Sequence, residues 1–301
     1  GFSCILRLLF TGISAMPLVT IAISCYNHAQ YISAQIESAL NQVGVDIELL
    51  VYDDGSKDES ISTIQALADK HGFFFQAQQN KGLAATLNDA LSRANGKYFC
   101  APGSDDIMFL DKTIKQFRFM ESNPDVAVCG GNVLLIDSNG ILINKRQRFH
   151  PARDLNFDQI FCNTSPGFVS PCAMIRTSTL KEVGGFREDI PLEDLSLWLK
   201  LSHAGHRFHV LNDAIYYYRK HETNTYKNIG FMRKCIVDSL SDYRSHPKHD
   251  QVLYTQLNSL FLTAAKQGDR ALAKDILKDI PSTHRNRKTW RGIFHMLTKS
   301  K

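Results

Sequence analysis

Between residues 18 and 101 the chain repeats one pattern, in which a short β-rich run is followed by a stretch with helical spacing of apolar residues. The runs favour strands at 18–24, 47–52, 73–77 and 97–101. The stretches between them favour helices at 31–40, 60–71 and 83–94. Strands that alternate with helices predict an α/β fold with a parallel sheet, whose ligands bind at the carboxyl ends of the strands.

Composition narrows the class of protein further. With 301 residues and 44% hydrophobic content, the chain can bury one large core, or a core and a small appendage. The net charge of +5 suits an anionic ligand or membrane as well as a nucleic acid, and we expect no nucleic-acid partner because no such module is recognisable. Seven scattered cysteines without metal-ligand spacing indicate neither a disulfide framework nor a zinc site, and favour a reducing cytoplasm.

A polar loop follows each of the four expected strands. In chain order these loops are Cys25-Tyr26-Asn27, Asp53-Asp54-Gly55-Ser56, Asn80-Lys81-Gly82 and Pro102-Gly103-Ser104-Asp105-Asp106. An aromatic face suits a base, carboxylates accept from a base or ribose, and backbone amides with a lysine at a helix start suit phosphate. The loops predict a nucleotide site at one edge of the sheet.

Each loop also has an ordinary interpretation. The first three can be turns or helix caps, and Asp105 with Asp106 could cap a helix that begins near Phe109. Adjacent carboxylates repel each other, however, and a divalent cation that also binds substrate phosphates explains such a pair at a strand end. The four loops together favour the nucleotide interpretation.

Four segments, in this order and spacing, resemble the family 2 glycosyltransferases. They are VTIAISCYNHAQYISAQIESALNQ, IELLVYDDGSKDES, NKGLAATLNDALSRANGKYFCAPGSDD and GGFREDIPLEDLSLWLKLSHAGHRF. The resemblance covers roughly residues 18 to 222. It implies the GT-A fold, a Rossmann-like, mostly parallel sheet flanked by helices, here with a C-terminal helical extension.

The resemblance also implies which residues contact the nucleotide-sugar. Ser24 and Tyr26 would line the base, with the Tyr26 ring stacked on it. Asp54 would accept a hydrogen bond from the base, and Asp53 would shape the pocket beside it. Further contacts to the nucleotide-sugar are expected from Asn27, Lys81, Gly82, Asn88 and Glu193.

The metal site is likewise implied by the resemblance. Asp105 would hold the ribose or the donor sugar, and Asp106 would coordinate the Mn²⁺ or Mg²⁺ that bridges the diphosphate. Many members carry an aspartate two positions before the adjacent pair, where this chain has Gly103. His221 would close over the diphosphate and join the metal shell, supported by Arg219 and Lys220; the alternative is an ordinary surface or packing histidine.

The acceptor side is expected from residues 184–201, where Glu193 and Asp194 open a helix with an apolar stripe. Acids at this position can simply complement the helix dipole. The resemblance instead implies that Asp194 is the general base of an inverting transfer, while Trp198 on the same stripe is expected in the core.

The sequence divides into three parts. Residues 1–16 are predicted to be an extension outside the fold, 17–225 the GT-A domain, and 226–301 a helical region with helices at 229–243, 252–267 and 271–280. From residue 282 the chain is basic without an acid, and Trp290, Ile293, Phe294 and Leu297 follow helical spacing. This pattern predicts either an amphipathic helix on anionic lipid or a tail that packs on the domain.

The function expected from these observations is the transfer of a sugar, with inversion, from a nucleotide-sugar to an acceptor hydroxyl. UDP as the nucleotide and polysaccharide or lipopolysaccharide assembly follow from the resemblance. A glycan or lipid-linked acceptor is expected, with a cytoplasmic location indicated by the cysteines and a place at the inner face of the cytoplasmic membrane indicated by the basic tail. The alternatives are a sugar nucleotidylyltransferase, which would carry a glycine-rich loop where this chain has CYNHAQ, and a non-catalytic nucleotide-sugar-binding protein. A nicotinamide dehydrogenase is disfavoured because GxGxxG is absent after the first strand.

Overall fold

A computed structural model describes residues 19–143, 149–164 and 167–298. The extension predicted at 1–16 lies outside the described residues. The strands are β1 (Val19–Cys25), β2 (Ile47–Asp53), β3 (Phe74–Ala77), β4 (Tyr98–Cys100), β5 (Ile107–Met108), β6 (Val126–Ile136), β7 (Arg153–Leu155), β8 (Met174–Arg176) and β9 (Arg207–Arg219). The α-helices are α1 (Ala29–Leu40), α2 (Ser60–His71), α3 (Leu83–Arg93), α4 (Lys112–Ser122), α5 (Phe157–Phe161), α6 (Thr177–Glu182), α7 (Glu193–His203), α8 (Ile229–Ser241), α9 (His249–Gln267), α10 (Arg270–Lys278) and α11 (Arg287–Thr298).

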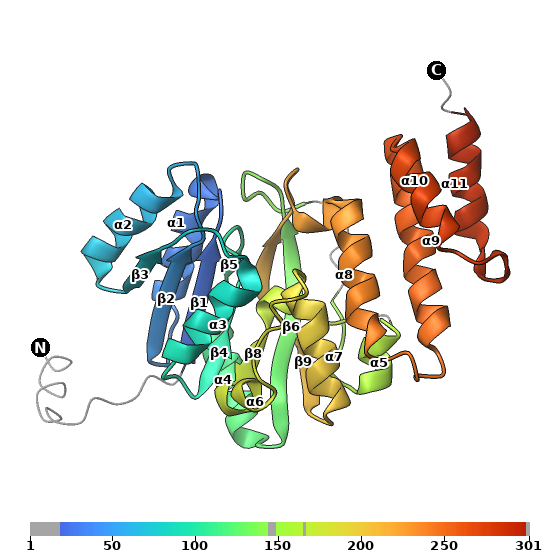
Figure 1. Ribbon diagram of the computed structural model, residues 1–301. Coiled ribbons are helices and arrows are strands. Elements are labelled where there is room, and N and C mark those ends of the chain that lie inside the picture. Colours follow the sequence, from blue (N-terminus) through green and yellow to red (C-terminus); the bar gives the residue numbers. More distant parts are fainter. Residues whose placement is uncertain (1–18, 144–148, 165–166, 299–301) are drawn as a thin grey trace, which may run out of the picture.

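All nine strands form one sheet in the order β3-β2-β1-β4-β8-β6-β9-β5, with β7 paired to β9 (Figure 1). Pairing is parallel from β3 to β4, in a register that sets Cys25 opposite Asp53. β8 runs antiparallel to both β4 and β6, and β6 is parallel to β9. Because β8 alone runs in the opposite direction between β4 and β6, the strands β1, β4, β6 and β9 all end at the same edge of the sheet. The predicted α/β fold is confirmed, and the sheet is mixed beyond β4.

Helices cover both faces of this sheet. On one face, Ile32 and Ile36 of α1, Ile64 of α2 and Met120 of α4 belong to one buried apolar cluster. On the other face, α3, α6 and α7 contribute to a second cluster together with the alternate residues of the strands. Both clusters hold the strands rigid, so the loops at the carboxyl edge are fixed in place from two sides.

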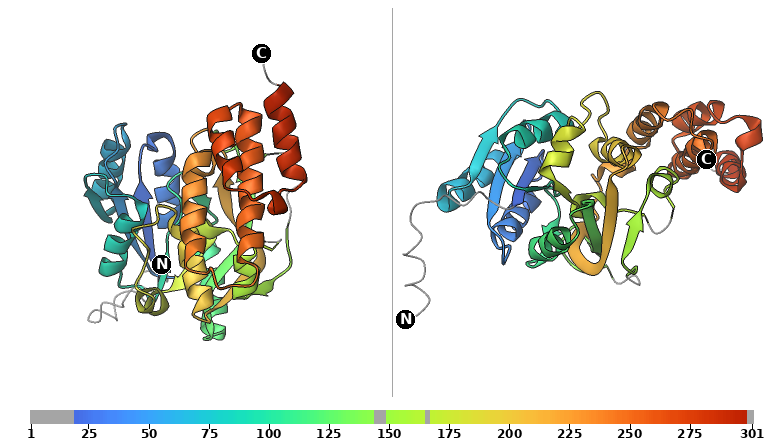
Figure 2. Two further views of the ribbon diagram at one scale, coloured as in Figure 1. Left: turned by 45° about the vertical axis from the view of Figure 1, so that its right-hand side comes forward. Right: turned by 90° about the horizontal axis from the view of Figure 1, so that it is seen from below.

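The C-terminal helices stand at the side of the molecule opposite β2 and β3 (Figures 1 and 2). α8 packs on α7 through Ile236, Leu240 and Leu199. α9, α10 and α11 share a cluster around Phe261, and a Cβ at Gly292 would lie 2.4 Å from the Phe261 ring. None of the helices in the described ranges is both long and apolar enough to cross a membrane.

The segments 207–211 and 215–218 belong to one strand, β9, because β6 pairs along its length across register shifts. Two element predictions need correction. The helix expected near Phe109 begins at Lys112 with Asp111 before it, so Asp105 and Asp106 do not cap it. The predicted apolar stripe of the tail is divided, since Ile293 packs into the α9–α11 cluster while Trp290 faces solvent.

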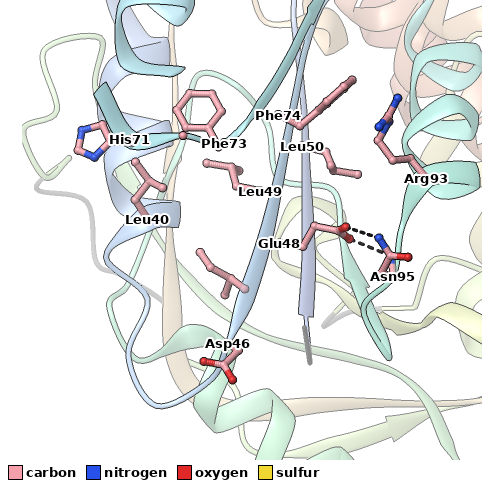
Figure 3. A pocket seen from close by; sticks show the side chains of 12 residues that line it. Leu40, Asp46, Glu48, Leu49, Leu50, His71, Phe73, Phe74, Arg93 and Asn95 are labelled. Carbon is pink, nitrogen blue, oxygen red and sulfur yellow. Dashed lines mark hydrogen bonds between the residues drawn. The ribbon is translucent and has the colours of Figure 1, made fainter. Parts of the chain in front are cut away.

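A groove of about 540 Å³ lies at the opposite edge of the sheet, beside the beginnings of β2 and β3 (Figure 3). Its floor carries a pair of hydrogen bonds from Asn95 to the Glu48 carboxylate, at 2.6 and 2.9 Å. These hydrogen bonds satisfy the polar groups of Asn95 and Glu48 within the protein. The groove is also remote from the carboxyl ends of the strands. We assign it no role in the chemistry.

Candidate active site

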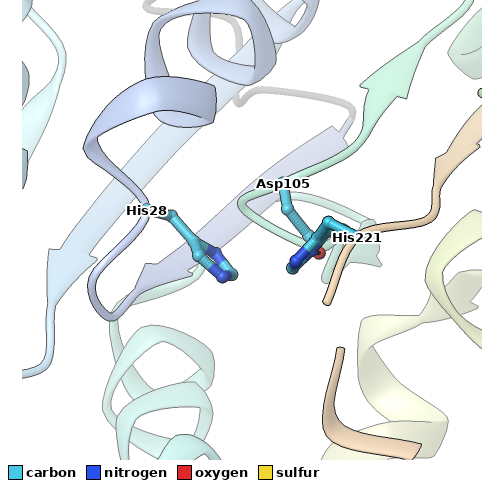
Figure 4. A group of neighbouring side chains, drawn as sticks. All are labelled: His28, Asp105 and His221. Carbon is cyan, nitrogen blue, oxygen red and sulfur yellow. Dashed lines mark hydrogen bonds and ion pairs between the residues drawn. The ribbon is translucent and has the colours of Figure 1, made fainter. Parts of the chain in front are cut away.

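Three loops at the carboxyl edge bring a carboxylate and two imidazoles together (Figure 4). His28 follows β1, Asp105 follows β4 and His221 follows β9. The Asp105 Oδ2 atom lies 2.7 Å from His221 Nε2, and one potential ligand atom from each of the three residues lies within 4.8 Å of the others. Two imidazoles and one carboxylate are a donor set that fits a divalent metal ion.

Asp105 and Asp106 differ in burial and in hydrogen-bond partners. Asp106 is 1% exposed, and its Oδ1 atom accepts a hydrogen bond of 2.7 Å from the Arg219 backbone N–H. Burial, and then the charge of Asp105, raise the pKa of Asp106 well above its usual range, although the Tyr216 hydroxyl also bonds to it. The structure thus places Asp105 beside His221, whereas Asp106, to which the sequence assigned the metal, is buried and bonded to Arg219.

Arg219 holds the acidic turn in place. Its Nε–H donates to the Asp105 carbonyl at 2.6 Å, and its Nη1 group donates to the carbonyls of Asp137 and Ser138 at 3.2 and 3.3 Å. The guanidinium also lies 4.8 Å from the centre of the Tyr31 ring. Arg219 is thus a buried clamp, and of the two cations expected to meet phosphate, Lys220 is the exposed one.

Asp54 organises the loop before α3. Its Oδ1 atom accepts from the Lys81 backbone N–H and from Gln78 Nε2, both at 3.0 Å, and Oδ2 accepts from the Gly82 N–H at 2.9 Å. A carboxylate has about four acceptor positions, so one remains on Oδ2 for a base. The same bonds occupy the backbone amides that the sequence offered to a phosphate, and this part of the phosphate prediction does not fit.

Asp53 and Asn27 join the first two loops. Asp53 accepts from the backbone N–H groups of Gly55 and Ser56 through Oδ1, while its buried Oδ2 meets no donor within the described residues. Asn27 adopts a left-handed φ of 55°, and its Oδ1 accepts from the Lys57 N–H at 2.7 Å. The Asn27 amide thus fixes a tight turn, which leaves the 47% exposed ring of Tyr26 beside the β1 end.

Other predicted contact residues are engaged within the protein. The Lys81 ammonium pairs with Asp89. Asn88 on α3 donates to the Phe186 carbonyl at 2.9 Å and to Glu188 at 2.8 Å, and it accepts from the Phe186 N–H at 2.9 Å. Asn88 therefore positions the segment that leads into α7, and Ser24 is a partly buried residue of β1.

The two acids that the sequence assigned to the acceptor side lie in the first turn of α7. Burial and the neighbouring Asp194 raise the pKa of Glu193 to about 8, and burial raises the pKa of Asp194. The Ser170 hydroxyl bonds to Asp194 and accepts from the Trp198 indole N–H at 2.7 Å. Because an indole can only donate, the Ser170 proton is left to point at Asp194.

Tyr218 connects the two acidic groups. Burial raises the pKa of its phenol most, and the charges of Asp106, Asp105 and Asp194 all raise it further. The Tyr218 phenol on β9 therefore senses the charges of the Asp105–Asp106 turn and of Asp194 on α7.

Two residues of this region were not singled out from the sequence. His28 had a signal, since it is a histidine in the loop directly after the first strand, where ligands of parallel sheets bind. Burial lowers the pKa of the His28 imidazole, so this ring is neutral at pH 7. Ser170 had none, because its segment precedes a strand of three residues and its partners lie 24 and 28 positions away.

Comparison with known proteins agrees with this geometry. The sequence model described as Glycosyl transferase family 2 matches residues 20–184. The putative glycosyltransferase EpsE of Bacillus subtilis (strain 168) is 29% identical over 221 residues, which are 71% of this chain and 77% of that protein.

Solved structures show the same fold at low identity. TarS 1–349 of S. aureus in complex with UDP-GlcNAc superposes with a TM-score of 0.62 at 21% identity, over 88% of this chain and 82% of that one. The mannosyltransferase PcManGT from Pyrobaculum calidifontis in complex with GDP-Man and Mn²⁺ gives a TM-score of 0.60 at 16% identity, over 96% and 89%.

Proposed function

The chain belongs to glycosyl transferase family 2, and we propose that it moves a sugar, with inversion, from a UDP-sugar to a hydroxyl of a glycan or lipid-linked acceptor in polysaccharide assembly. The observation that carries the proposal is that Tyr218 senses the charges of two acidic groups, one with imidazole neighbours and one with raised pKa values. TarS with UDP-GlcNAc and PcManGT with GDP-Man support a nucleotide-sugar donor.

In this proposal Asp105 and His221 hold Mn²⁺ or Mg²⁺, in place of the Asp106 expected from the sequence. Such an ion neutralises the charge that develops on the diphosphate as the sugar leaves. Asp105 suits the task because its carboxylate is 16% exposed and faces the imidazole 2.7 Å away. Asp106 and Arg219 act as positioning residues that fix the turn.

Asp194 is proposed as the general base. A carboxylate works best as a base when its pKa approaches the working pH, and the burial of Asp194 moves its pKa in that direction. Ser170 bonds to the carboxylate and keeps it oriented while an acceptor hydroxyl loses its proton. Glu193, with its raised pKa, is protonated at pH 7 and is proposed to donate a hydrogen bond to the acceptor or donor sugar.

The test separates donor binding from transfer. A panel of nucleotide-sugars is screened for thermal stabilisation that depends on Mn²⁺, since a ligand of the native state raises the melting temperature. With the donor so identified, Asp194→Asn should keep this stabilisation and lose transfer by about 10²-fold or more. Asp69→Asn, an exposed aspartate on α2, serves as the matched control.

Each outcome decides a separate part of the proposal. An active Asp194→Asn enzyme would exclude Asp194 as the base. A wild-type protein that binds nucleotide-sugars but transfers no sugar would be a binding protein without catalysis.

We further propose that α11 contacts an anionic lipid surface. Trp290, Phe294 and Leu297 are 63%, 64% and 72% exposed on the outer side of α11, while Thr289 and Gly292 face inward. Residues 282–301 include six Lys or Arg residues and no acid. Apolar side chains flanked by cations match a negatively charged lipid headgroup layer.

Vesicle flotation tests this partner. The protein should float with vesicles that contain phosphatidylglycerol and remain unbound with phosphatidylcholine vesicles. Combined Trp290→Ser and Phe294→Ser changes should abolish flotation, whereas Leu110→Ser, which removes another exposed apolar side chain, should not. Equal flotation of the double variant and wild type would exclude α11 as the contact.

A further inference from the structure

His28 has an unusual position for a residue at a helix start. It is the residue before α1, yet its side chain makes no capping hydrogen bond. The ring instead turns toward His221, with the ring centres 5.6 Å apart and the planes perpendicular (Figure 4). A potential ligand atom of His28 lies within 4.8 Å of those of Asp105 and His221.

The two imidazoles of this cluster are held in the same way. His28 Nδ1 lies 2.8 Å from the Ser104 hydroxyl, and His221 Nδ1 lies 2.8 Å from the Thr223 hydroxyl. A histidine that binds metal through Nε2 usually donates its Nδ1–H to such an oxygen, which fixes both the tautomer and the ring orientation. Within the described residues, His28 Nε2 has no hydrogen-bond partner, so this nitrogen is available as a ligand.

We propose that His28 is a third protein ligand of the divalent cation, which makes the site a set of two histidines and one carboxylate. The inference rests on the proposed function for the cation itself. Residue 103 offers no ligand, since it is glycine, and a Cβ there would lie 2.8 Å from Asp105 Oδ1 and 2.9 Å from Asp106 Oδ2. The third ligand therefore comes from the loop after β1.

This donor set has a consequence for the choice of metal. Mg²⁺ prefers oxygen ligands and keeps several waters, whereas imidazole nitrogen suits transition metals. His28 therefore raises the affinity for Mn²⁺ while it adds little for Mg²⁺. The enzyme discriminates between the two ions through a residue outside the acidic turn.

The experiment measures metal affinity without any turnover. Free Mn²⁺ is followed by its EPR signal during titration of wild type, His28→Gln and Asp105→Asn, each with UDP present, and Mg²⁺ affinity is taken from competition. His28→Gln should raise the Kd for Mn²⁺ by about tenfold or more and change the Kd for Mg²⁺ much less. His71→Gln, which removes an exposed histidine at the end of α2, should change neither.

A second measurement does not depend on the folding of the His28 variant. Pulsed EPR detects ¹⁴N coupling of imidazoles that coordinate Mn²⁺, and His221→Gln should keep the coupling of one coordinated imidazole, that of His28. Loss of all nitrogen coupling in His221→Gln, or an unchanged Mn²⁺ affinity in a folded His28→Gln protein, would overturn the inference and leave the cation site at Asp105. Failure of wild type to bind Mn²⁺ at all would instead overturn the metal part of the proposed function.

Discussion

Replacement of Glu193 by glutamine should make the protein more stable at alkaline pH. Removal of the Glu193 carboxyl from water, and then the charge of the neighbouring Asp194, raise the pKa of Glu193 from 4.5 to about 8. The folded protein therefore holds a proton that the unfolded chain releases above pH 4.5. Glutamine copies the protonated carboxyl at every pH, and so it avoids the cost of a charge in this position.

The size of the effect follows from linkage between protonation and folding. Each unit of pKa difference is worth about 1.4 kcal/mol, so the stability that depends on the Glu193 proton is fully present below pH 4.5 and is lost as pH rises to 8. The pKa difference between the folded and unfolded states is about 3.5, which sets an upper limit of about 5 kcal/mol on this loss of stability. Partial hydration of the carboxylate makes the actual loss smaller. The advantage of Glu193→Gln should therefore be below about 1 kcal/mol at pH 5 and several kcal/mol at pH 9.

Urea denaturation at pH 5, 7 and 9, without metal or nucleotide, measures this difference. Glu182→Gln, which changes an exposed glutamate at the end of α6, should show no such growth with pH. If the free energies of unfolding of Glu193→Gln and wild type differed equally at pH 5 and pH 9, the carboxyl would be hydrated and unperturbed. The role of Glu193 as a hydrogen-bond donor at pH 7 would then fall as well.

Two further changes test the surroundings of the base and the packing of the tail. Ser170→Ala removes a hydrogen bond that favours the charged form of Asp194, so the pKa of Asp194 should rise further. The acidic limb of the pH–rate profile should then shift to higher pH. An unshifted profile would show that the Ser170 hydroxyl does not act on Asp194. Gly292→Ala places a Cβ 2.4 Å from the Phe261 ring and should destabilise the α9–α11 packing by about 1–3 kcal/mol in thermal unfolding. Gly230→Ala, also in a helix but with only an ordinary contact of 3.8 Å from the added Cβ to Asn228 Oδ1, should be neutral or slightly stabilising. Equal effects of the two changes would refute the steric argument.

The first half of the fold was predictable because its signals are local. β1, β2 and the three helices up to residue 93 are long enough to show their own period, and α2 has the bounds that the sequence indicates, with Gly72 at a φ of 75° ending it. β5, β7 and β8 have only two or three residues, and tertiary pairing decides that they are strands. Sequence periodicity cannot resolve elements so short.

The site was predictable as a place and less so as a set of contacts. The four loops were expected at one edge of the sheet, and two of them, after β1 and β4, supply groups that lie beside His221 after β9. The amides of Lys81 and Gly82 looked open for phosphate, but the carboxylate that binds them, Asp54, stands 27 and 28 positions earlier in the chain. Composition reveals which groups can form hydrogen bonds and leaves open whether the protein itself already uses them.

The proposed transfer of the metal from Asp106 to Asp105 has the same origin. Both carboxylates approach Gly103, where a Cβ would lie 2.8 Å from Asp105 Oδ1 and 2.9 Å from Asp106 Oδ2, so the turn itself does not decide which of them meets the ligand. The difference between them comes from β9, whose Arg219 N–H donates a hydrogen bond to Asp106 Oδ1 and whose continuation sets His221 against Asp105. The metal assignment was therefore undecidable from the acidic turn alone, since residues more than 110 positions later determine the direction of each carboxylate.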